Sequence, residues 1–455
     1  MAIASSNPAT GEVEKTFSPL SREEIEAKLR LAQTAFGTHA RVATEQRAAW
    51  LGSVAATLEK EKLRLATIAV REMGKPIRQA TAEVEKCAAV CRYYSEHAAA
   101  FLNAEPVRTE ARQSYVRYEP LGAVLAIMPW NFPYWQVFRF AAPAIAAGNV
   151  GLLKHASNVP QCALAIEQLI SSSGVPDGIF QTLLVESAAV PQLIDDPRVA
   201  AVTLTGSEAA GAEVAAQAGR NIKKTVLELG GSDAFVVLPS ADVEAAADAA
   251  VQARIINNGQ SCIAAKRFIV SHTVAEEFRR RMLAGFSALV VGDPLDERTQ
   301  IGPLVSRAAL ETLDDQVRRL VAGGARILAG GSPLDRPGYY YAPTIVDLVE
   351  PRTDAAQEEL FGPVALLLEA RDAAHAVQLA NSTCFGLGAS IWTNDSAEVE
   401  RFVPEIQAGV VFVNAMVKSD PRLPFGGVKR SGYGRELGVW GMREFVNVKS
   451  VWIER

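Results

Sequence analysis

Short apolar runs alternate with helical segments along most of this 455-residue chain. In the first half these runs lie at residues 124–128, 150–153, 182–185 and 199–204. Strands that are joined through helices run parallel to one another, because the crossover helix returns the chain to the end at which the preceding strand began. The alternation therefore predicts a doubly wound parallel sheet, an α/β fold that commonly binds nucleotides.

The same alternation resumes after Glu228, with apolar runs at residues 235–238, 267–270, 365–368 and 410–413. A chain of this length is also too long for one ordinary hydrophobic core. We therefore expect two doubly wound domains. Residues 1–105 and 121–229 would form a Rossmann-like dinucleotide-binding domain, and residues 230–432 a second domain that carries catalytic residues.

Two extended segments, residues 108–119 and 446–452, have no evident strand partner inside these domains. Unpaired strand edges favour pairing with another chain. We expect residues 106–120 and 433–455 to form a small β oligomerisation arm, and the protein to assemble as a homodimer or a homotetramer.

The charge balance and the cysteine content exclude several kinds of protein. A net charge of -5 supplies no basic surface for nucleic acid. No apolar stretch is long enough to span a membrane, and the first residues lack the basic start and apolar core of an export signal. The five cysteines form neither a disulfide framework nor a metal site. We expect a cytoplasmic protein without a bound metal, whose substrate is a small molecule.

Cys262 is the candidate nucleophile of the chain. It ends the segment Gly259-Gln260-Ser261-Cys262, in which a flexible glycine precedes it and small residues follow. A cysteine thiolate is strongly nucleophilic, so modest activation makes such a residue reactive. The alternative is a small buried apolar side chain, which is the usual role of a free cysteine.

Asn131 and Glu228 are candidates for two further chemical roles. Asn131 follows a predicted strand directly, where its amide would either donate to a developing oxyanion or make a turn. Glu228 lies among apolar neighbours, and burial there would raise its pKa towards that of a useful general base. The alternative for Glu228 is a surface-loop carboxylate.

Two strand ends carry groups that suit an anion. Gly206 and Ser207 lie between a predicted strand and a predicted helix, so backbone N–H groups and a hydroxyl gather at a helix start. Lys154 and Ser157 place a cation and another hydroxyl after a neighbouring strand. Neither segment is a G-x-G-x-x-G or Walker motif, so each by itself is a weak indication of a cofactor site.

Five motifs occur in one order along the chain, at residues 129–133, 227–231, 259–262, 359–363 and 424–427. Together they resemble the aldehyde dehydrogenase superfamily, and the resemblance covers essentially the whole chain. It implies that Cys262 attacks the aldehyde carbon and that the Asn131 amide and the Cys262 backbone N–H hold the resulting oxygen. It also implies that Glu228 activates the water that hydrolyses the thioester.

The resemblance further implies a nicotinamide cofactor, with Glu359 on the nicotinamide ribose and Phe361 near the ring. The expected cofactor-binding residues are Trp130, Lys154, Ser157, Gly206, Ser207, Leu229, Glu359 and Phe361. NAD-preferring members commonly carry an acidic residue where this chain has Ser157. A carboxylate would repel a 2′-phosphate, whereas Ser157 can donate to it and Lys154 adds a positive charge. We therefore expect NADP, with NAD as the weaker alternative.

The substrate-binding residues implied by the resemblance are Trp135, Arg139, Ser261 and Ser419. Arg139 and Ser419 are similar to residues with which succinate-semialdehyde dehydrogenases bind the distal carboxylate, although some members carry an arginine where this chain has Ile256. We expect oxidation of succinate semialdehyde to succinate. Glutarate semialdehyde or an uncharged aldehyde is the nearer alternative, a cofactor-free thiol esterase is a more distant one, and a non-catalytic protein of the same fold is the most distant.

Overall fold

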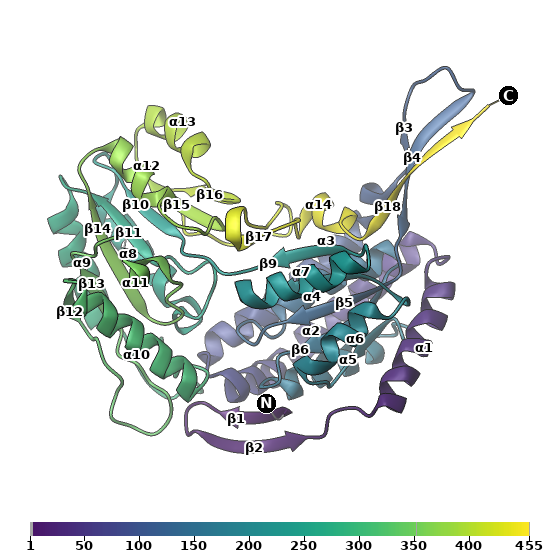
Figure 1. Ribbon diagram of the computed structural model, residues 1–455, viewed down its shortest axis with the longest axis horizontal. Helices are drawn as coiled ribbons and strands as arrows, with labels where there is room; N and C mark the ends of the chain where they lie inside the picture. Colours follow the sequence, from purple (N-terminus) through teal and green to yellow (C-terminus); the bar gives the residue numbers. More distant parts are fainter. Residues whose placement is uncertain (1–2, 352, 455) are drawn as a thin grey trace.

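The computed structural model describes residues 3–351 and 353–454. It contains two large sheets side by side, a short N-terminal hairpin, and a β arm that projects away from the rest (Figure 1). This arrangement confirms the predicted α/β fold class.

The first sheet has six strands in the order β17-β9-β8-β5-β6-β7. Its strands are β5 (Ala123–Met128), β6 (Val150–His155), β7 (Phe180–Thr182), β8 (Val199–Thr205), β9 (Lys224–Glu228) and β17 (Gly432–Tyr433). All pair in parallel except β17, which is antiparallel to β9. The central strands are buried on both faces, as near-continuous runs of Val, Leu and Ala require in a parallel sheet.

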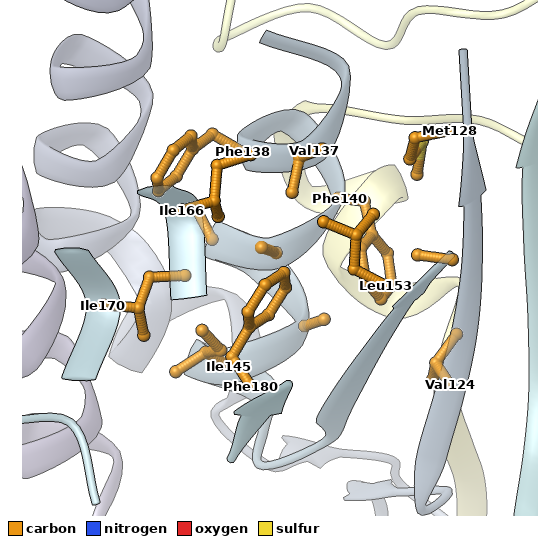
Figure 2. Packing of buried hydrophobic residues seen from close by; sticks show 14 of the residues in the cluster. Val124, Met128, Val137, Phe138, Phe140, Ile145, Leu153, Ile166, Ile170 and Phe180 are labelled. Carbon is orange, nitrogen blue, oxygen red and sulfur yellow. The ribbon is translucent and has the colours of Figure 1, made fainter. Parts of the chain in front are cut away.

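Helices surround this sheet and complete its core. They are α1 (Arg22–His39), α2 (Thr44–Met73), α3 (Ile77–Leu102), α4 (Trp135–Ala147), α5 (Pro160–Ser172), η1 (Ser187–Ala189), α6 (Val190–Asp195), α7 (Glu208–Arg220) and α14 (Gly438–Arg443). Figure 2 shows the side chains that fill the layer between α4, α5 and the strands, among them Phe138, Phe140, Leu153 and Ile166. Helix α4 is buried along its whole length, so it positions the residues that precede it rigidly.

The second sheet has seven strands in the order β12-β13-β14-β11-β10-β15-β16. Its strands are β10 (Ala234–Val237), β11 (Arg267–Ser271), β12 (Arg326–Ala329), β13 (Thr344–Asp347), β14 (Val364–Ala370), β15 (Gly388–Trp392) and β16 (Val410–Val413). The helices of this part are α8 (Val243–Ile255), η2 (Ile256–Gly259), α9 (Ala275–Ser287), α10 (Arg307–Ala322), α11 (Asp354–Gln357), α12 (Ala373–Asn381), α13 (Ser396–Glu405) and η3 (Lys429–Ser431). Separate hydrophobic clusters cover this sheet, as the alternation of strands and helices predicts.

The arm pairs β4 (Gln113–Pro120) with β18 (Val446–Ile453) and β3 (Glu105–Pro106), and the N-terminal hairpin pairs β1 (Ile3–Asn7) with β2 (Glu12–Phe17). The predicted arm is too long at its C-terminal part. Residues 433–445 do not project: Tyr433 belongs to the first sheet, α14 packs on α4, and Leu437 and Met442 are buried in the first core. Within the described ranges, every helix is either too short or too polar to cross a membrane.

Candidate active site

A cavity of about 230 Å³ lies where the loops of the two sheets meet. Its walls are Pro129, Trp130, Asn131, Gln136, Thr205, Gly206, Ser207, Leu229, Gly230, Cys262, Glu359 and Phe361. The first sheet supplies the loops that follow β5, β8 and β9, and the second part supplies Cys262 and the segment before β14. Because parallel strands end at one edge of a sheet, residues distant in sequence meet there.

Asn131 is held directly beside the cysteine loop. Its Nδ2 donates to the carbonyl of Gln260 at 3.1 Å. Asn257 completes the link, because its Nδ2 donates to the carbonyls of both Asn131 (2.6 Å) and Gln260 (2.9 Å). The Asn131 amide and the half-buried Cys262 thiol therefore share one cavity wall, which is the arrangement that an oxyanion at an attacked carbonyl needs.

The cysteine loop requires an unusual backbone. Asn257, Asn258 and Gly259 have φ values of 55°, 58° and 75°. Asparagine tolerates this left-handed region better than most residues. Only glycine fits at position 259, because a Cβ there would lie 2.3 Å from the carbonyl carbon of Gly362. Asn258 anchors the turn by donating to the carbonyls of Gly74 (2.9 Å) and Pro303 (3.0 Å). The amide-rich run before Cys262 thus holds the backbone that presents the sulfur.

The electrostatics at Cys262 favour the thiol. Burial raises the pKa of Cys262 to about 12, although the nearby Lys266 opposes this shift. The Nζ of Lys266 donates to the carbonyls of Ser261 (2.7 Å) and Cys262 (2.6 Å) and lies 3.2 Å from Oε1 of Glu359. A group that takes the thiol proton is therefore needed before the sulfur can attack.

Glu228 ends β9 and is only 2% exposed, one residue before the cavity wall at Leu229. Burial raises the pKa of Glu228 well above its ordinary value, in the direction that the sequence predicts, and the charge of Arg139 opposes the rise. Gly426 packs against it so closely that a Cβ would lie 2.8 Å from Oε1. The close approach explains why a glycine stands in that motif.

Arg139, which the resemblance implies as a substrate-binding residue, is not among the residues that line the cavity. In the structure Arg139 is buried, its guanidinium lies 4.8 Å from the ring centroid of Phe425, and its Nε contacts the carboxylate of Glu436. Glu436, which the sequence analysis missed, already supplies the negative charge.

The other expected substrate residues also lie off the cavity wall. Ser261 is fully buried, and among the described residues its hydroxyl has no hydrogen-bond partner. Trp135 is covered by Lys86, whose Nζ lies 4.1 Å from the ring centroid, and Ser419 accepts a hydrogen bond from the same Nζ at 2.7 Å. Trp135 and Ser419 therefore both contact Lys86, a residue for which the sequence analysis assigned no role.

Most of the expected cofactor residues face the cavity. Trp130 and Phe361 meet edge to face at 5.7 Å, and Oε1 of Glu359 accepts from the Gly231 N–H at 3.1 Å. Ser207 caps α7 by accepting from the Ala210 N–H. These side chains come from separate loops, so only the folded chain brings them to one wall.

Lys154 and Ser157 lie beyond this cavity, at the end of β6 and just after it. Lys154 is 7% exposed, burial lowers its pKa, and no carboxylate of the described residues pairs with it. An ammonium that is buried without a partner favours an anionic ligand. Ser157 is half-buried, and its carbonyl accepts from the Ala4 N–H at 3.0 Å, which steadies the turn.

Two residues that the sequence analysis missed hold the Asn131 segment in place. The Oε1 atom of Glu83 accepts from the N–H groups of Tyr134 (2.8 Å) and Trp135 (2.9 Å). His155 contacts the carbonyl of Pro133 through Nε2 at 2.9 Å, while burial lowers its pKa to about 4 and keeps the ring neutral. No local sequence signal marks either contact, because both partners are distant along the chain.

Comparisons with known proteins show the family to which the chain belongs. The sequence matches the Aldehyde dehydrogenase family over residues 1–451. It is 54% identical over 453 residues to the probable succinate-semialdehyde dehydrogenase (NADP(+)) of Synechocystis sp. and 52% identical over 456 residues to succinate-semialdehyde dehydrogenase (NADP(+)) 1 of Mycobacterium tuberculosis, and each pair is covered completely. The structure superposes on succinic semialdehyde dehydrogenase from Streptococcus pyogenes in complex with NADP+ with a TM-score of 0.98, at 36% identity and full coverage of both chains.

Proposed function

The chain belongs to the aldehyde dehydrogenase family, and from that membership we propose that it oxidises succinate semialdehyde to succinate with NADP⁺ as the hydride acceptor. Full-length relatives at 52–54% identity carry this activity in their names. The observation that supports the chemistry most directly is the shared wall of Asn131, Cys262, Glu359 and Phe361 around one cavity. A thiol esterase would need the first two of these residues but not the last two.

In the proposed reaction the Cys262 sulfur forms a bond to the aldehyde carbon after its proton has left for a base. The Asn131 Nδ2–H and the Cys262 N–H donate to the oxygen of the resulting thiohemiacetal. NADP⁺ held against this cavity wall would supply the hydride acceptor, and loss of the hydride would convert the thiohemiacetal on Cys262 into a thioester. Glu228 then takes a proton from the water that attacks this thioester, so that succinate leaves and the thiol is restored.

The residues present suit the cofactor. Glu359 offers a carboxylate to a ribose hydroxyl, and Ser207 and the start of α7 offer donors to a phosphate. The unpaired Lys154 and the hydroxyl of Ser157 are suited to the additional 2′-phosphate.

We also propose a separate function for the part of the chain around each sheet. Residues 1–105 and 121–229 would bind the dinucleotide, and the part that starts at residue 230 would carry the catalytic cysteine. We further propose a homodimer or homotetramer that forms through the β arm, and a cytoplasmic location, in keeping with five free cysteines. Sedimentation and cell fractionation test these two proposals.

A matrix of initial rates tests the main proposal. Succinate semialdehyde, glutarate semialdehyde and butanal are each supplied with NADP⁺ or NAD⁺, and the reduced cofactor is followed at about 340 nm. The pair of succinate semialdehyde and NADP⁺ should give the highest kcat/KM, and Cys262→Ala should abolish the signal. A higher kcat/KM for another aldehyde would overturn the substrate, and full activity of Cys262→Ala would overturn the mechanism.

A further inference from the structure

Lys266 is a fully buried cation that contacts two separate parts of the active site. It lies four residues after Cys262 and directly before β11, and 0% of its side chain is exposed. Its backbone is fixed on both sides. The Lys266 N–H donates to the carbonyl of Asp233, just before β10, at 3.1 Å, and the Lys266 carbonyl accepts from the Leu366 N–H of β14 at 2.9 Å. The ammonium is therefore held at the edge of the second sheet that faces the cysteine loop.

The first part that Lys266 contacts is the peptide that carries the Cys262 N–H. The Lys266 Nζ donates to the carbonyls of Ser261 at 2.7 Å and Cys262 at 2.6 Å, and the Ser261 carbonyl also accepts from the Ala264 N–H at 3.2 Å. The Ser261 carbonyl and the Cys262 N–H belong to one trans peptide plane, in which they point in opposite directions. Because the carbonyl faces Lys266, the Cys262 N–H points away from the ammonium. This N–H is one of the two donors to the thiohemiacetal oxygen in the proposed reaction.

The second part is the carboxylate of Glu359 in the cavity wall. Its Oε1 lies 3.2 Å from the Lys266 Nζ and accepts from the Gly231 N–H at 3.1 Å. Its Oε2 lies beside Gly230, another residue of the cavity wall, where a Cβ would come within 2.8 Å of this oxygen. Glu359 keeps 20% of its side chain exposed. Two donors therefore hold Oε1, and Oε2 is left to accept from a ligand in the cavity.

No other cation forms an ion pair with Glu359 among the residues that the structure describes. Arg254 is also fully buried in this region, but its Nη2 donates to the carbonyl of Gly259 at 2.5 Å. Asp233 is buried as well, and its charge acts on Lys266 without an ion-pair contact. Removal of the Lys266 ammonium would therefore leave Glu359 without its charge partner and the Cys262 carbonyl without this donor.

We propose that Lys266 is a positioning residue that orients the Cys262 N–H towards the thiohemiacetal oxygen and directs Oε2 of Glu359 towards the nicotinamide ribose. Lys266 is not among the residues that line the cavity, so it acts through these two groups and not on the aldehyde itself. Hydrogen bonds and ion pairs that are shielded from water hold their partners firmly, because no solvent competes for the same groups. This inference rests on the proposed function, because it needs the roles that Cys262 and Glu359 have there.

The first test measures cofactor binding without turnover. Lys266→Met keeps the length of the side chain and removes its charge. Isothermal titration calorimetry should show that the Kd for NADP⁺ rises about 10-fold or more in this variant, as the loss of a charged hydrogen bond predicts. The Kd for adenosine 2′,5′-bisphosphate, which lacks the nicotinamide ribose, should stay as in the wild type. In a Glu359→Gln background, Lys266→Met should change the Kd for NADP⁺ by less than about 3-fold, because the two residues act on one contact.

The second test follows acyl transfer to Cys262 without a cofactor. p-Nitrophenyl acetate acylates a cysteine through an oxyanion, whereas alkylation by iodoacetamide forms none and reports the thiolate fraction alone. The ratio of the acylation rate to the alkylation rate should fall about 10-fold or more in Lys266→Met, because a misplaced donor loses part of the 100- to 1,000-fold contribution that one oxyanion donor makes. The ratio separates this effect from any change in the pKa of Cys262.

Arg267→Met is the matched control, because it removes a buried cation from the next residue. Arg267 donates only to backbone carbonyls outside the cysteine loop, those of Ser232, Leu379 and Ala380. Arg267→Met should lower the free energy of unfolding, yet keep the wild-type Kd for NADP⁺ and the wild-type rate ratio. If Lys266→Met does not fold, Lys266→Gln takes its place in both tests, with the same expected changes.

An unchanged Kd for NADP⁺, or an unchanged rate ratio, in the folded Lys266 variant would overturn the double role of Lys266. Equal changes in Arg267→Met would overturn it too, because they would reflect a general loosening of the core. These outcomes leave the proposed function intact. If the wild type preferred another aldehyde or NAD⁺, the proposed function would fail. The rate ratio, and the Kd for NAD⁺ compared with that for AMP, would then still decide the role of Lys266.

Discussion

Cys262 lies in surroundings that disfavour its charged form. Burial raises the pKa of Cys262 to about 12, and the charges of Lys266 and, less strongly, Arg139 oppose this rise. Cys262 therefore stays protonated until a base removes the thiol proton during catalysis. The low thiolate fraction also slows oxidation of Cys262, because susceptibility to oxidation rises with the thiolate fraction.

We predict that alkylation of Cys262 by iodoacetamide in the cofactor-free enzyme accelerates about tenfold per pH unit from pH 7 to pH 10, without a plateau. The thiolate fraction grows in this proportion at every pH below the pKa of about 12. Mass spectrometry of the peptide that contains Cys262 measures the rate separately from that of the exposed Cys384. A plateau below pH 9 would contradict the raised pKa.

Ser157 lies three residues after the unpaired ammonium of Lys154, and we predict that Ser157→Glu lowers kcat/KM for NADP⁺ by about 100-fold. A carboxylate there repels the 2′-phosphate and offers an acceptor to a ribose hydroxyl instead. Activity with NAD⁺ should be kept or improved, and Ser157→Ala, which adds no charge, should have a much smaller effect. Steady-state kinetics with both cofactors measure the shift. Equal NADP⁺ efficiency in wild type and Ser157→Glu would show that residue 157 does not select the cofactor.

At the scale of elements, the start of α4 depends on α3. Helix α4 has no side-chain cap of its own, and the Glu83 carboxylate accepts from its first free N–H groups instead. The same carboxylate pairs with the buried Lys75, whose Nζ also lies 4.2 Å from the Phe132 ring centroid. One buried ion pair therefore positions the segment that carries Asn131.

We predict that Glu83→Gln lowers the free energy of unfolding by about 3–5 kcal/mol, because it leaves the Lys75 ammonium buried without its charge partner. Denaturant-induced unfolding measures this loss. Glu85→Gln, on the exposed side of the same helix, removes only a surface pair with Lys62 and should cost less than about 1 kcal/mol. Similar losses in both variants would argue against a stabilising ion pair between Glu83 and Lys75.

The sequence pattern predicted the positions of most strands better than it predicted the contacts between side chains. The apolar runs at residues 124–128 and 199–204 coincide with β5 and β8, whereas the run at 182–185 overlaps the short β7 only at Thr182. Strand β15 was not anticipated, although it lies inside the second sheet. Its sequence, Gly388–Trp392, places three small residues before Ile391 and Trp392, so no long run of large apolar side chains marks this buried strand.

At the scale of the whole molecule, the β arm projects away from the two large sheets (Figure 1). β18 pairs with β4 along its length, and Val448 and Trp452 expose 59% and 48% of their surface. Val448 and Trp452 are four residues apart on one strand, and their exposure supports the proposed assembly through the arm.

We predict that Val448→Glu combined with Trp452→Glu converts the protein to a smaller species, because two carboxylates would have to be buried in the interface. Light scattering coupled to gel filtration measures the mass. Glu119→Gln, elsewhere in the arm, is the matched control and should keep the wild-type mass. An unchanged mass of the double variant would place the subunit interface elsewhere.

The amino-acid sequence alone was enough for the fold class, the family resemblance, and the identities of Cys262, Asn131 and Glu228 as candidates, because periodicity and short motifs are local properties of the chain. Only the tertiary structure decided which charges meet. Glu436 reaches Arg139, and Lys86 is left with Ser419 and Trp135, since these residues are far apart in sequence and become neighbours only after the helices and sheets have packed.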